Sequence, residues 1–157
     1  MDTASTSTVN AIESIYREEG RRLWWAIVAY AGDREVASDA VAEAFAQALA
    51  RGDALVDPLA WIWRVAFRLA AGELKRRGQT DHRLPEVASP DEQRATELVA
   101  LLRLLPGKQR AAIVLHCYAD RPVREVALAL GVSPATARVQ LHRGRRRLMR
   151  LLEDRDG

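Results

Sequence analysis

The chain has 157 residues, enough for one ordinary domain or two small ones, and a formal net charge of +3. Its longest apolar run, which begins at Leu23, is far too short to cross a bilayer, and the N-terminal residues lack the basic and apolar parts of a signal peptide. We therefore predict a cytoplasmic protein without membrane insertion. The single cysteine, Cys117, excludes an internal disulfide.

Three helices are predicted in the first half of the chain, after a disordered N-terminus at 1–8. Apolar residues recur there with the helical period. Asp33 is a favourable N-cap for the second helix, and Asp57 followed by Pro58 is a strong start signal for the third, which Gly78 ends. The predicted helices cover about 9–30, 33–50 and 58–77, and together they form a first module at 9–78.

A linker is predicted at 79–91, where two prolines interrupt a stretch with little periodicity. A second helical module follows at 92–153. Its predicted helices cover about 92–105, 108–119, 123–130 and the residues after Ser133, which caps a helix that Pro134 opens. No alternating pattern indicates a strand, so the predicted fold is all-α, with two small helical domains joined by a linker.

The end of the second module has the pattern of a helix-turn-helix, because a short helix, a turn at Gly131 and a longer helix follow one another. The residues that can close its small core are Val126, Ala127, Leu130, Val132, Ala137 and Leu141. The residues on the outward side of the last helix are Ser133, Ala135, Thr136, Arg138, Val139, Gln140, His142 and Arg143.

Arginine and glutamine suit base edges in a major groove, and the following Arg145, Arg146, Arg147 and Arg150 suit phosphates. This run predicts binding to duplex DNA. A solvated helix with arginines near its C-terminus explains only two or three of these side chains.

The third helix has a broad apolar side and a narrower side with Arg64, Arg68 and Lys75, and Trp61 lies in the middle of that narrower side. An exposed tryptophan flanked by cations suits single-stranded nucleic acid, since the ring stacks on a base and the cations bind the backbone. Packing of Trp61 under a neighbouring loop is the alternative that the sequence leaves open.

Carboxylates gather on the second helix, where Asp39 and Glu43 lie one turn apart and Glu35 is nearby. A helix surface offers no dry cavity for catalysis, so we predict a docking patch for a basic partner or a solvated face. The chain has no phosphate loop and no nucleophile motif, and its histidines (His82, His116, His142) lack metal-ligand spacing. We expect neither an enzyme, nor a metal site, nor a cofactor.

The sequence resembles the extracytoplasmic-function group of bacterial RNA polymerase sigma factors, over about residues 12–153. In the first module the resemblance includes "IYREEGRRLWW", "GDREVASDAVAEAF" and "DPLAWIWRVAFRLAAGELKRR". In the second it includes "LLRLLPGKQRAAIVLHCYADRPVREVALALGVSPATARVQLHRGRRRLMRLLE". The order and spacing of both modules agree with the family.

The resemblance implies a promoter-specificity subunit that binds core RNA polymerase, recognises the −35 and −10 promoter elements and promotes DNA opening. The first module corresponds to region 2 and the second to region 4. The implied −35 residues are Ser133, Thr136, Arg138, Gln140, His142, Arg143, Arg145 and Arg146. The implied −10 residues are Trp61, Arg64, Arg68, Lys75 and Arg76. Glu35, Asp39 and Glu43 are implied to bind the clamp of the largest subunit. The helices at about 104–115 are implied to rest on the flap of the polymerase. Many members are also held inactive by an anti-sigma factor.

Three positions depart from the family's pattern. Ala42 stands where a glutamine is usual, Arg68 where an asparagine is usual, and Gly72 where an aspartate is frequent. The last two lie on the DNA-facing side of the third helix and bear on −10 readout and melting. Two alternatives therefore stay open: a plain helix-turn-helix regulator, and a degenerate sigma-like protein that binds DNA or polymerase without promoter melting.

Overall fold

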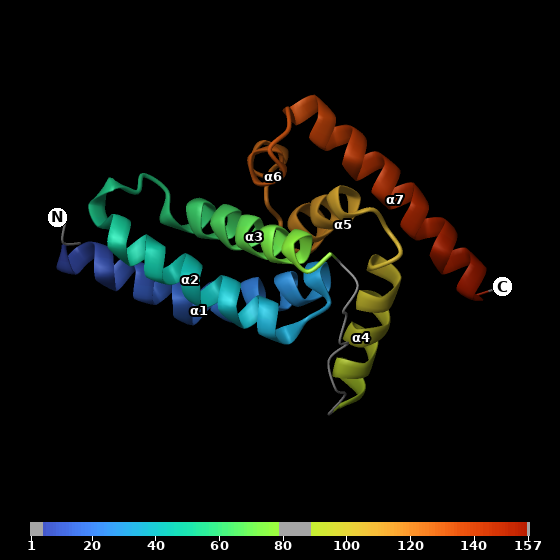
Figure 1. Cartoon of the computed structure of the whole chain (residues 1–157), viewed down its shortest axis with the longest axis horizontal. Helices are drawn as coiled ribbons and strands as arrows, with labels where there is room; N and C mark the ends of the chain where they lie inside the picture. Colours follow the sequence, from blue (N-terminus) through green and yellow to red (C-terminus); the bar gives the residue numbers. More distant parts are fainter. Residues whose placement is uncertain (1–4, 79–88, 157) are drawn as a thin grey trace.

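The computed structural model describes residues 5–78 and 89–156, and within them every regular element is helical (Figure 1). Helices α1 to α3 form the N-terminal module, and helices α4 to α7 form the C-terminal module. Their bounds are α1 Thr6–Ala31, α2 Arg34–Arg51, α3 Pro58–Arg76, α4 Pro90–Leu102, α5 Gly107–Ile113, α6 Val123–Leu130 and α7 Pro134–Asp156. A 3₁₀ turn, η1 Gly52–Ala54, follows α2, and a π-helical segment, η2 Val114–Tyr118, continues α5.

The predicted start signals are confirmed. Asp33 caps α2 by accepting hydrogen bonds from the N–H groups of Glu35 and Val36, and Asp57 caps α3 in front of Pro58. Helix α1 begins earlier than predicted, because the Ser5 hydroxyl accepts the N–H of Thr8. Ser5 is thus the cap of α1 and residues 6–8 form its first turn, while residues 1–4 lie outside the described part of the chain.

The predicted helix at 108–119 is one element with a change of winding. It begins as an α-helix, α5, and becomes the π-helical η2, after which Asp120 adopts a positive φ of 55°. A single residue inserted into the winding shifts the side chains that follow it, and such π segments are frequent at functional sites. Most of the predicted linker, residues 79–88, lies outside the described residues.

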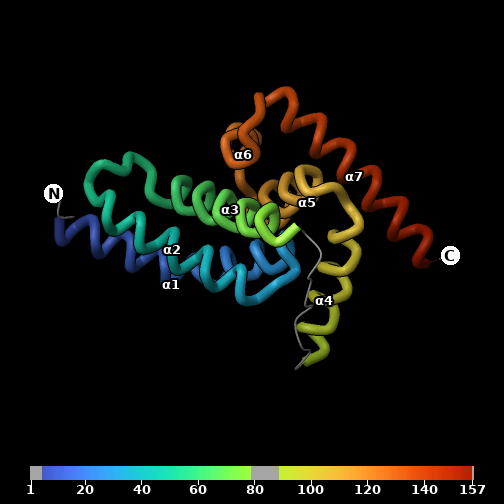
Figure 2. The backbone as a smooth tube through the Cα atoms, in the orientation of Figure 1, coloured from blue at the N-terminus to red at the C-terminus, as the bar shows by residue number. Residues whose placement is uncertain are grey.

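The two modules lie side by side (Figure 2), and one apolar core runs through both. In the N-terminal module α1, α2 and α3 pack side by side around Ile27, Ile62 and Trp63. A linker of this kind sets no orientation between the modules by itself. In the structure direct packing sets it, because α6 lies against α3 while α4 and η2 lie against α1.

Candidate nucleic-acid interface

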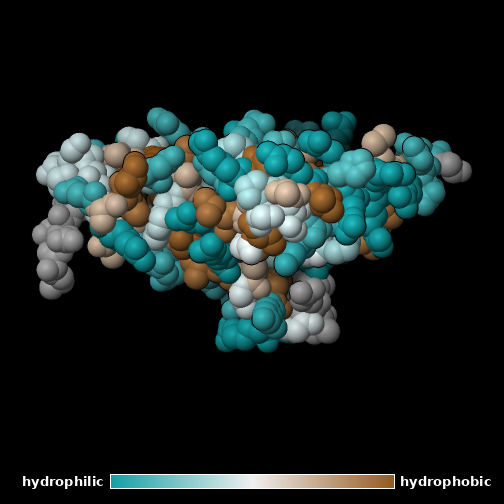
Figure 3. All heavy atoms as spheres, turned by 90° about the horizontal axis from the view of Figure 1, so that it is seen from above, coloured by the Kyte–Doolittle hydropathy of each residue, from teal (hydrophilic) through white to brown (hydrophobic). Residues whose placement is uncertain are grey.

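The outward side of α7 is exposed and basic. Of the predicted −35 residues, the exposed ones are Ser133, Thr136, Arg138, His142, Arg143, Arg145 and Arg146, and Gln140 is half-buried. The inward residues Ala137 and Leu141 are buried against α6, so the predicted division of the helix is confirmed. Seen from above in Figure 3, the arm formed by α7 is mostly hydrophilic.

Within the described residues, the arginines in the middle of this face have no acidic partner. Among the described residues, Arg138, Arg143 and Arg146 form no ion pair, and the carboxylate paired with α7 is Glu97, which binds Arg155 at 2.8 Å near the C-terminus. Unpaired guanidinium groups on an exposed helix suit a polyanionic partner, because phosphates supply the missing counter-charge.

Two of the predicted DNA-binding residues also begin the helix. The Ser133 hydroxyl accepts the N–H of Thr136 at 3.1 Å and donates to the Thr136 hydroxyl at 3.0 Å. The cap leaves the following side chains in the first turns of α7, where a recognition helix contacts base edges. The left-handed φ of 68° at Gly131 makes the turn from α6 into this cap.

The position of α7 depends on a close approach to α5 at Gly144. A Cβ atom added there would lie 3.0 Å from the Ile113 side chain and 3.3 Å from the carbonyl oxygen of Gln109. Glycine therefore allows the backbones of α5 and α7 to approach more closely than any other residue would. This contact holds the middle of α7 against α5.

The predicted exposed tryptophan on α3 is not fully exposed. Trp61 is half-buried against the apolar core, and the guanidinium carbon of Arg51 lies 5.7 Å from the centre of its ring. The ring therefore packs on its neighbours, as the alternative reading of the sequence expects, and has one cation over it.

The cations of α3 differ in their surroundings. Lys75 is exposed, whereas Arg64 is half-buried and its Nε has no hydrogen-bond partner. Arg68 donates from Nη2 to the carbonyl oxygen of Leu128 in α6 at 2.7 Å. Arg76 donates to the carboxylate of Glu73 at 2.6 and 3.0 Å, so this predicted DNA contact is already paired within α3. Arg68, Lys75 and Arg76 are thus all exposed, but unlike the arginines in the middle of α7, Arg68 and Arg76 already have partners within the chain.

The predicted acidic residues Glu35, Asp39 and Glu43 are exposed together on α2. They line a surface groove of about 390 Å³ between α2 and α3, whose other wall carries Arg76 and Arg77. The groove brings together carboxylates and guanidinium groups, an arrangement suited to a polar partner surface rather than to an apolar ligand.

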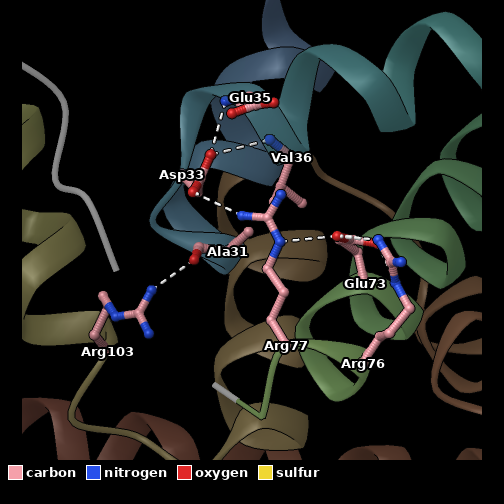
Figure 4. Close-up of polar contacts among 8 residues, drawn as sticks. All are labelled: Ala31, Asp33, Glu35, Val36, Glu73, Arg76, Arg77 and Arg103. Carbon is pink, nitrogen blue, oxygen red and sulfur yellow. Dashed lines mark hydrogen bonds and ion pairs between the residues drawn. The ribbon is translucent and has the colours of Figure 1, made fainter. Parts of the chain in front are cut away.

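An ion-pair network fixes the α2 and α3 ends beside this groove (Figure 4). Asp33 is 8 % exposed, and its second carboxylate oxygen lies 3.3 Å from Nη1 of Arg77. Arg77 also donates to Glu73 at 2.8 Å, and the hydrogen bonds from Arg76 and then Arg77 lower the pKa of Glu73. The spacing of Glu73 to Arg76 and Arg77 is readable in the sequence, but the bond to Asp33 is not.

Arginines that the sequence reading did not single out lie between the modules. Arg22 of α1 donates to the carbonyl oxygen of Tyr118 at 2.6 Å, and Arg103 donates to that of Ala31 at 2.5 Å (Figure 4). Arg110 is 4 % exposed, its Cζ lies 5.2 Å from the centre of the Tyr30 ring, and burial lowers its pKa. Nothing in the sequence distinguishes these arginines from solvated ones.

An apolar pocket of about 370 Å³ lies where α1, α4, η2 and α7 meet. Its lining includes Trp25, Leu98, Leu102, Val114 and Leu148. Cys117 at its edge is exposed and accepts a long contact from Arg145 at 3.6 Å.

His116 is half-buried, and its Nδ1 lies 2.9 Å from the carbonyl oxygen of Arg121. His82 is outside the described residues. Within 5–78 and 89–156, no group of three or more His, Cys, Asp or Glu is arranged to hold a metal ion, and no helix is long and apolar enough to cross a membrane.

The fold and the exposed face define the class: an all-helical protein of two modules, the second a helix-turn-helix with a basic recognition helix. Residues 95–148 match the family model described as Sigma-70, region 4. The chain is 39 % identical over 77 residues to RNA polymerase sigma-E factor of Streptomyces avermitilis, a match that covers 46 % of this chain and 43 % of the relative. It is 33 % identical over 129 residues to ECF RNA polymerase sigma factor SigJ of Mycobacterium tuberculosis, covering 70 % and 41 %.

Solved structures show the same fold over most of the chain. The structure of CnrH in complex with the cytosolic domain of CnrY matches with a TM-score of 0.74 at 22 % identity, covering 92 % of this chain and 89 % of that one. The sigma factor RpoE in complex with the anti-sigma factor NepR from Bartonella quintana matches with a TM-score of 0.68 at 18 % identity, covering 90 % and 98 %.

Together these findings show that residues 95–148 match Sigma-70 region 4 and that the chain is similar in sequence to extracytoplasmic-function sigma factors. The chain spans about two fifths of the length of the curated relatives it matches, 43 % of one and 41 % of the other.

Proposed function

We propose that this chain is a promoter-specificity subunit, which binds core RNA polymerase, recognises promoter DNA and favours strand opening. The observation that carries the proposal is the outward face of α7, where Arg138, Arg143 and Arg146 are exposed and form no ion pair among the described residues. This face belongs to the helix-turn-helix at 95–148 that matches Sigma-70 region 4. In this role α7 enters the major groove of the −35 element.

The division of the chain supports two roles. We assign 9–78 to a region 2-like domain and 92–153 to a region 4-like domain. In the first, Trp61 and the cations Arg64, Arg68, Lys75 and Arg76 bind the −10 element as it opens. In the second, base readers such as Arg138 give specificity and phosphate contacts such as Arg146 give affinity.

The proposed polymerase contacts lie on other surfaces. Glu35, Asp39 and Glu43 bind the clamp of the largest subunit from the groove beside α3, and the apolar pocket next to η2 receives the flap. An anti-sigma factor is a further proposed partner, supported by the structural likeness to RpoE in complex with NepR. The proposed role places the chain in the cytoplasm and requires no catalytic group of its own, because the polymerase forms the bonds.

In vitro transcription tests the proposal. The chain is added to core RNA polymerase with a library of genomic fragments, and the 5′ ends of the transcripts are mapped. We expect initiation at a defined set of start sites that depends on both the chain and the core. A matched variant with Arg138→Ala and Arg143→Ala should lose these start sites while it still binds the core. If the chain binds DNA but never supports initiation, the proposal fails and a plain DNA-binding regulator replaces it.

Promoter opening is tested separately with Trp61→Ala. The proposal expects fewer open complexes, measured by permanganate reactivity of unpaired thymines, at unchanged binding to the core. Open-complex formation that is insensitive to this change would remove the melting role from α3 and leave the role of α7 intact.

A further inference from the structure

The loop between α2 and α3 is tied to the beginning of α1 by hydrogen bonds. Ser5 donates to Oδ1 of Asp53 from its backbone N–H at 3.2 Å and from its hydroxyl at 2.9 Å, and the Thr8 hydroxyl donates to the same oxygen. Figure 1 shows the N-terminal end of α1 and this loop at the same end of the molecule. We call the three residues Ser5, Thr8 and Asp53 the hydroxyl latch.

The capping of α1 does not account for the hydroxyl latch. The Ser5 hydroxyl oxygen caps the helix by accepting the backbone N–H of Thr8 at 3.2 Å. This cap leaves the Thr8 hydroxyl for Asp53, which lies 45 positions away in the sequence. The hydrogen bonds from Thr8 and then Ser5 lower the pKa of Asp53, so its carboxylate is ionised at neutral pH and the bonds of the latch are charge-assisted.

Asp53 belongs to the loop at 52–57, which leads directly into α3. Within this loop Leu55 packs on the apolar core, Val56 is fully exposed, and Asp57 caps α3. Among the described residues, the side-chain hydrogen bonds from the loop to a helix other than α3 are those of Asp53 to the beginning of α1. The latch therefore fixes the exposed part of the loop, where the apolar core cannot.

The same loop adjoins Trp61. Arg51 precedes the loop directly, and its Cζ lies 5.7 Å from the centre of the Trp61 ring. Arg51 and Val56 are exposed, and Trp61 is half-buried. An aromatic ring with a cation and an exposed apolar residue beside it suits an unpaired strand, because bases stack on rings and phosphates bind cations. The conformation of the loop decides where Arg51 and Val56 lie relative to the ring.

We propose that the hydroxyl latch positions the loop at 52–57 beside Trp61, so that loop and ring form one preformed surface for an unpaired DNA strand. Asp53 is a positioning residue here, because it acts through the loop and its negative charge would repel phosphates. The inference rests on the proposed function in taking Trp61 as a contact of the opened strand. A preformed surface binds more tightly than a mobile one, since less conformational entropy is lost on binding.

Thr8→Val tests the latch with a small change, because valine keeps the shape of threonine and removes the hydroxyl donor. The matched control is Thr6→Val, since Thr6 lies in the same turn of α1, is exposed, and makes no side-chain hydrogen bond among the described residues. Thr8→Ser keeps the hydroxyl and should rescue the latch. Asp53→Ala is a second, independent variant, which removes the acceptor of all three bonds from an exposed position.

Two measurements are made on the full chain. Hydrogen exchange followed by mass spectrometry reports the mobility of the loop at 52–57. Fluorescence anisotropy at one salt concentration gives the affinity for an oligothymidine of about 20 nucleotides, longer than one binding site, and for a mixed-sequence duplex of the same length. Each variant is also measured in a Trp61→Ala background.

Thr8→Val and Asp53→Ala should speed exchange in the loop and weaken oligothymidine binding roughly three- to tenfold, as when the competent loop falls from nearly all molecules to a third or a tenth. The direction for Asp53→Ala is decisive, because loss of a negative charge by itself strengthens binding to any polyanion. Duplex affinity should not fall, since α7 lies in the other module. Thr6→Val and Thr8→Ser should behave like the unchanged chain.

The Trp61→Ala background shows whether latch and ring act together. If they do, the effect of Thr8→Val on oligothymidine binding disappears there, because the ring that the loop adjoins is gone. Unchanged exchange in the loop of both latch variants would overturn the inference, since the latch would not position the loop. Faster exchange with unchanged or tighter oligothymidine binding would overturn it too, since the loop would be no part of the strand surface.

The failure of this inference and that of the proposed function are distinguishable by Trp61→Ala alone. If this change weakens oligothymidine binding and the latch variants do not, the single-strand face stays on α3 and only the latch is wrong. If Trp61→Ala leaves oligothymidine binding unchanged, the assignment of the single-strand face fails and the inference fails with it.

Discussion

Helices α3 and α7 carry the same sequence signal and have different surroundings. Both place cations opposite an apolar stripe, and both are predicted to bind nucleic acid. In α7 the cationic side is exposed and its arginines at 138, 143 and 146 form no ion pair among the described residues. In α3 the corresponding side is exposed at Arg68, Gly72 and Lys75, but Arg68 already binds a carbonyl oxygen of α6. The comparison teaches that an exposed cation is fully available to a ligand only if the rest of the chain leaves it without a partner.

The largest loss of stability is expected from a substitution in α6, the helix that packs against both α3 and α7. Val126 is 0 % exposed, and Val126→Asp would place a carboxylate in the core that positions α7 and covers α3. We expect a loss of about 4 kcal/mol or more in unfolding free energy, measured by urea denaturation. The control is Leu128→Asp on the same helix, where the side chain is 49 % exposed and the cost should stay within about 1 kcal/mol. Equal losses would mean that α6 is not packed as described.

The second largest loss of stability is expected where α7 packs against α5 at Gly144. Gly144→Leu would force a side chain against Ile113 and the backbone of Gln109, and overpacking of this kind costs about 1–3 kcal/mol. Denaturation measures the loss, and a weaker affinity for duplex DNA should accompany it because the recognition helix is displaced. Full stability of this variant would contradict the close approach of α5 and α7.

Removal of one phosphate contact from the open face should have a smaller and sequence-independent effect. Arg146→Ala should reduce the slope of log binding constant against log salt concentration by about 0.9. Fluorescence anisotropy over a salt series measures this slope. Arg94→Ala, an exposed arginine of α4, should leave it unchanged. A base reader differs, since Arg138→Ala should cost about 1–3 kcal/mol only at its cognate base pair.

Gly72 in α3 differs from Gly144 because there is free space for a side chain around it. No atom lies within 4 Å of a Cβ added at Gly72, and the residue is exposed in the middle of a helix. Gly72→Ala should therefore raise the unfolding free energy by up to about 1 kcal/mol, because alanine loses less backbone entropy on folding. Thermal unfolding checks the direction, and a destabilised variant would show that another surface covers this position.

The smallest effect is expected from pH. Because its partners Arg76 and Arg77 lower the pKa of Glu73 in the folded chain below the usual 4.5, this carboxylate stabilises the fold above about pH 4.5 and the contribution disappears as the pH falls through the lowered value. Glu73→Gln should make stability decline less steeply with acidification in that window. Urea denaturation at several pH values measures the slope, and a steeper decline in the variant would contradict the assignment.

The sequence by itself determined the helices and both candidate faces. Caps such as Asp33, Asp57 and Ser133 act on the N–H groups two or three residues away, so their effect is local and readable. The helix-turn-helix follows from the same local rules, since a short helix, a glycine turn and a capped second helix occur in order. The resemblance to the family rested on these same stretches.

Tertiary structure alone decided which arginines bind partners elsewhere in the chain. The hydrogen bonds of Arg22, Arg68 and Arg103 join residues that lie 96, 60 and 72 positions apart in the sequence. Backbone carbonyl oxygens accept these bonds, and a carbonyl group is the same in every residue, so no side-chain pattern marks the partner. The packing of α6 against α3 likewise uses apolar residues, and the same residues could form the cores of two separate modules. Their mutual packing appears only when the chain is folded.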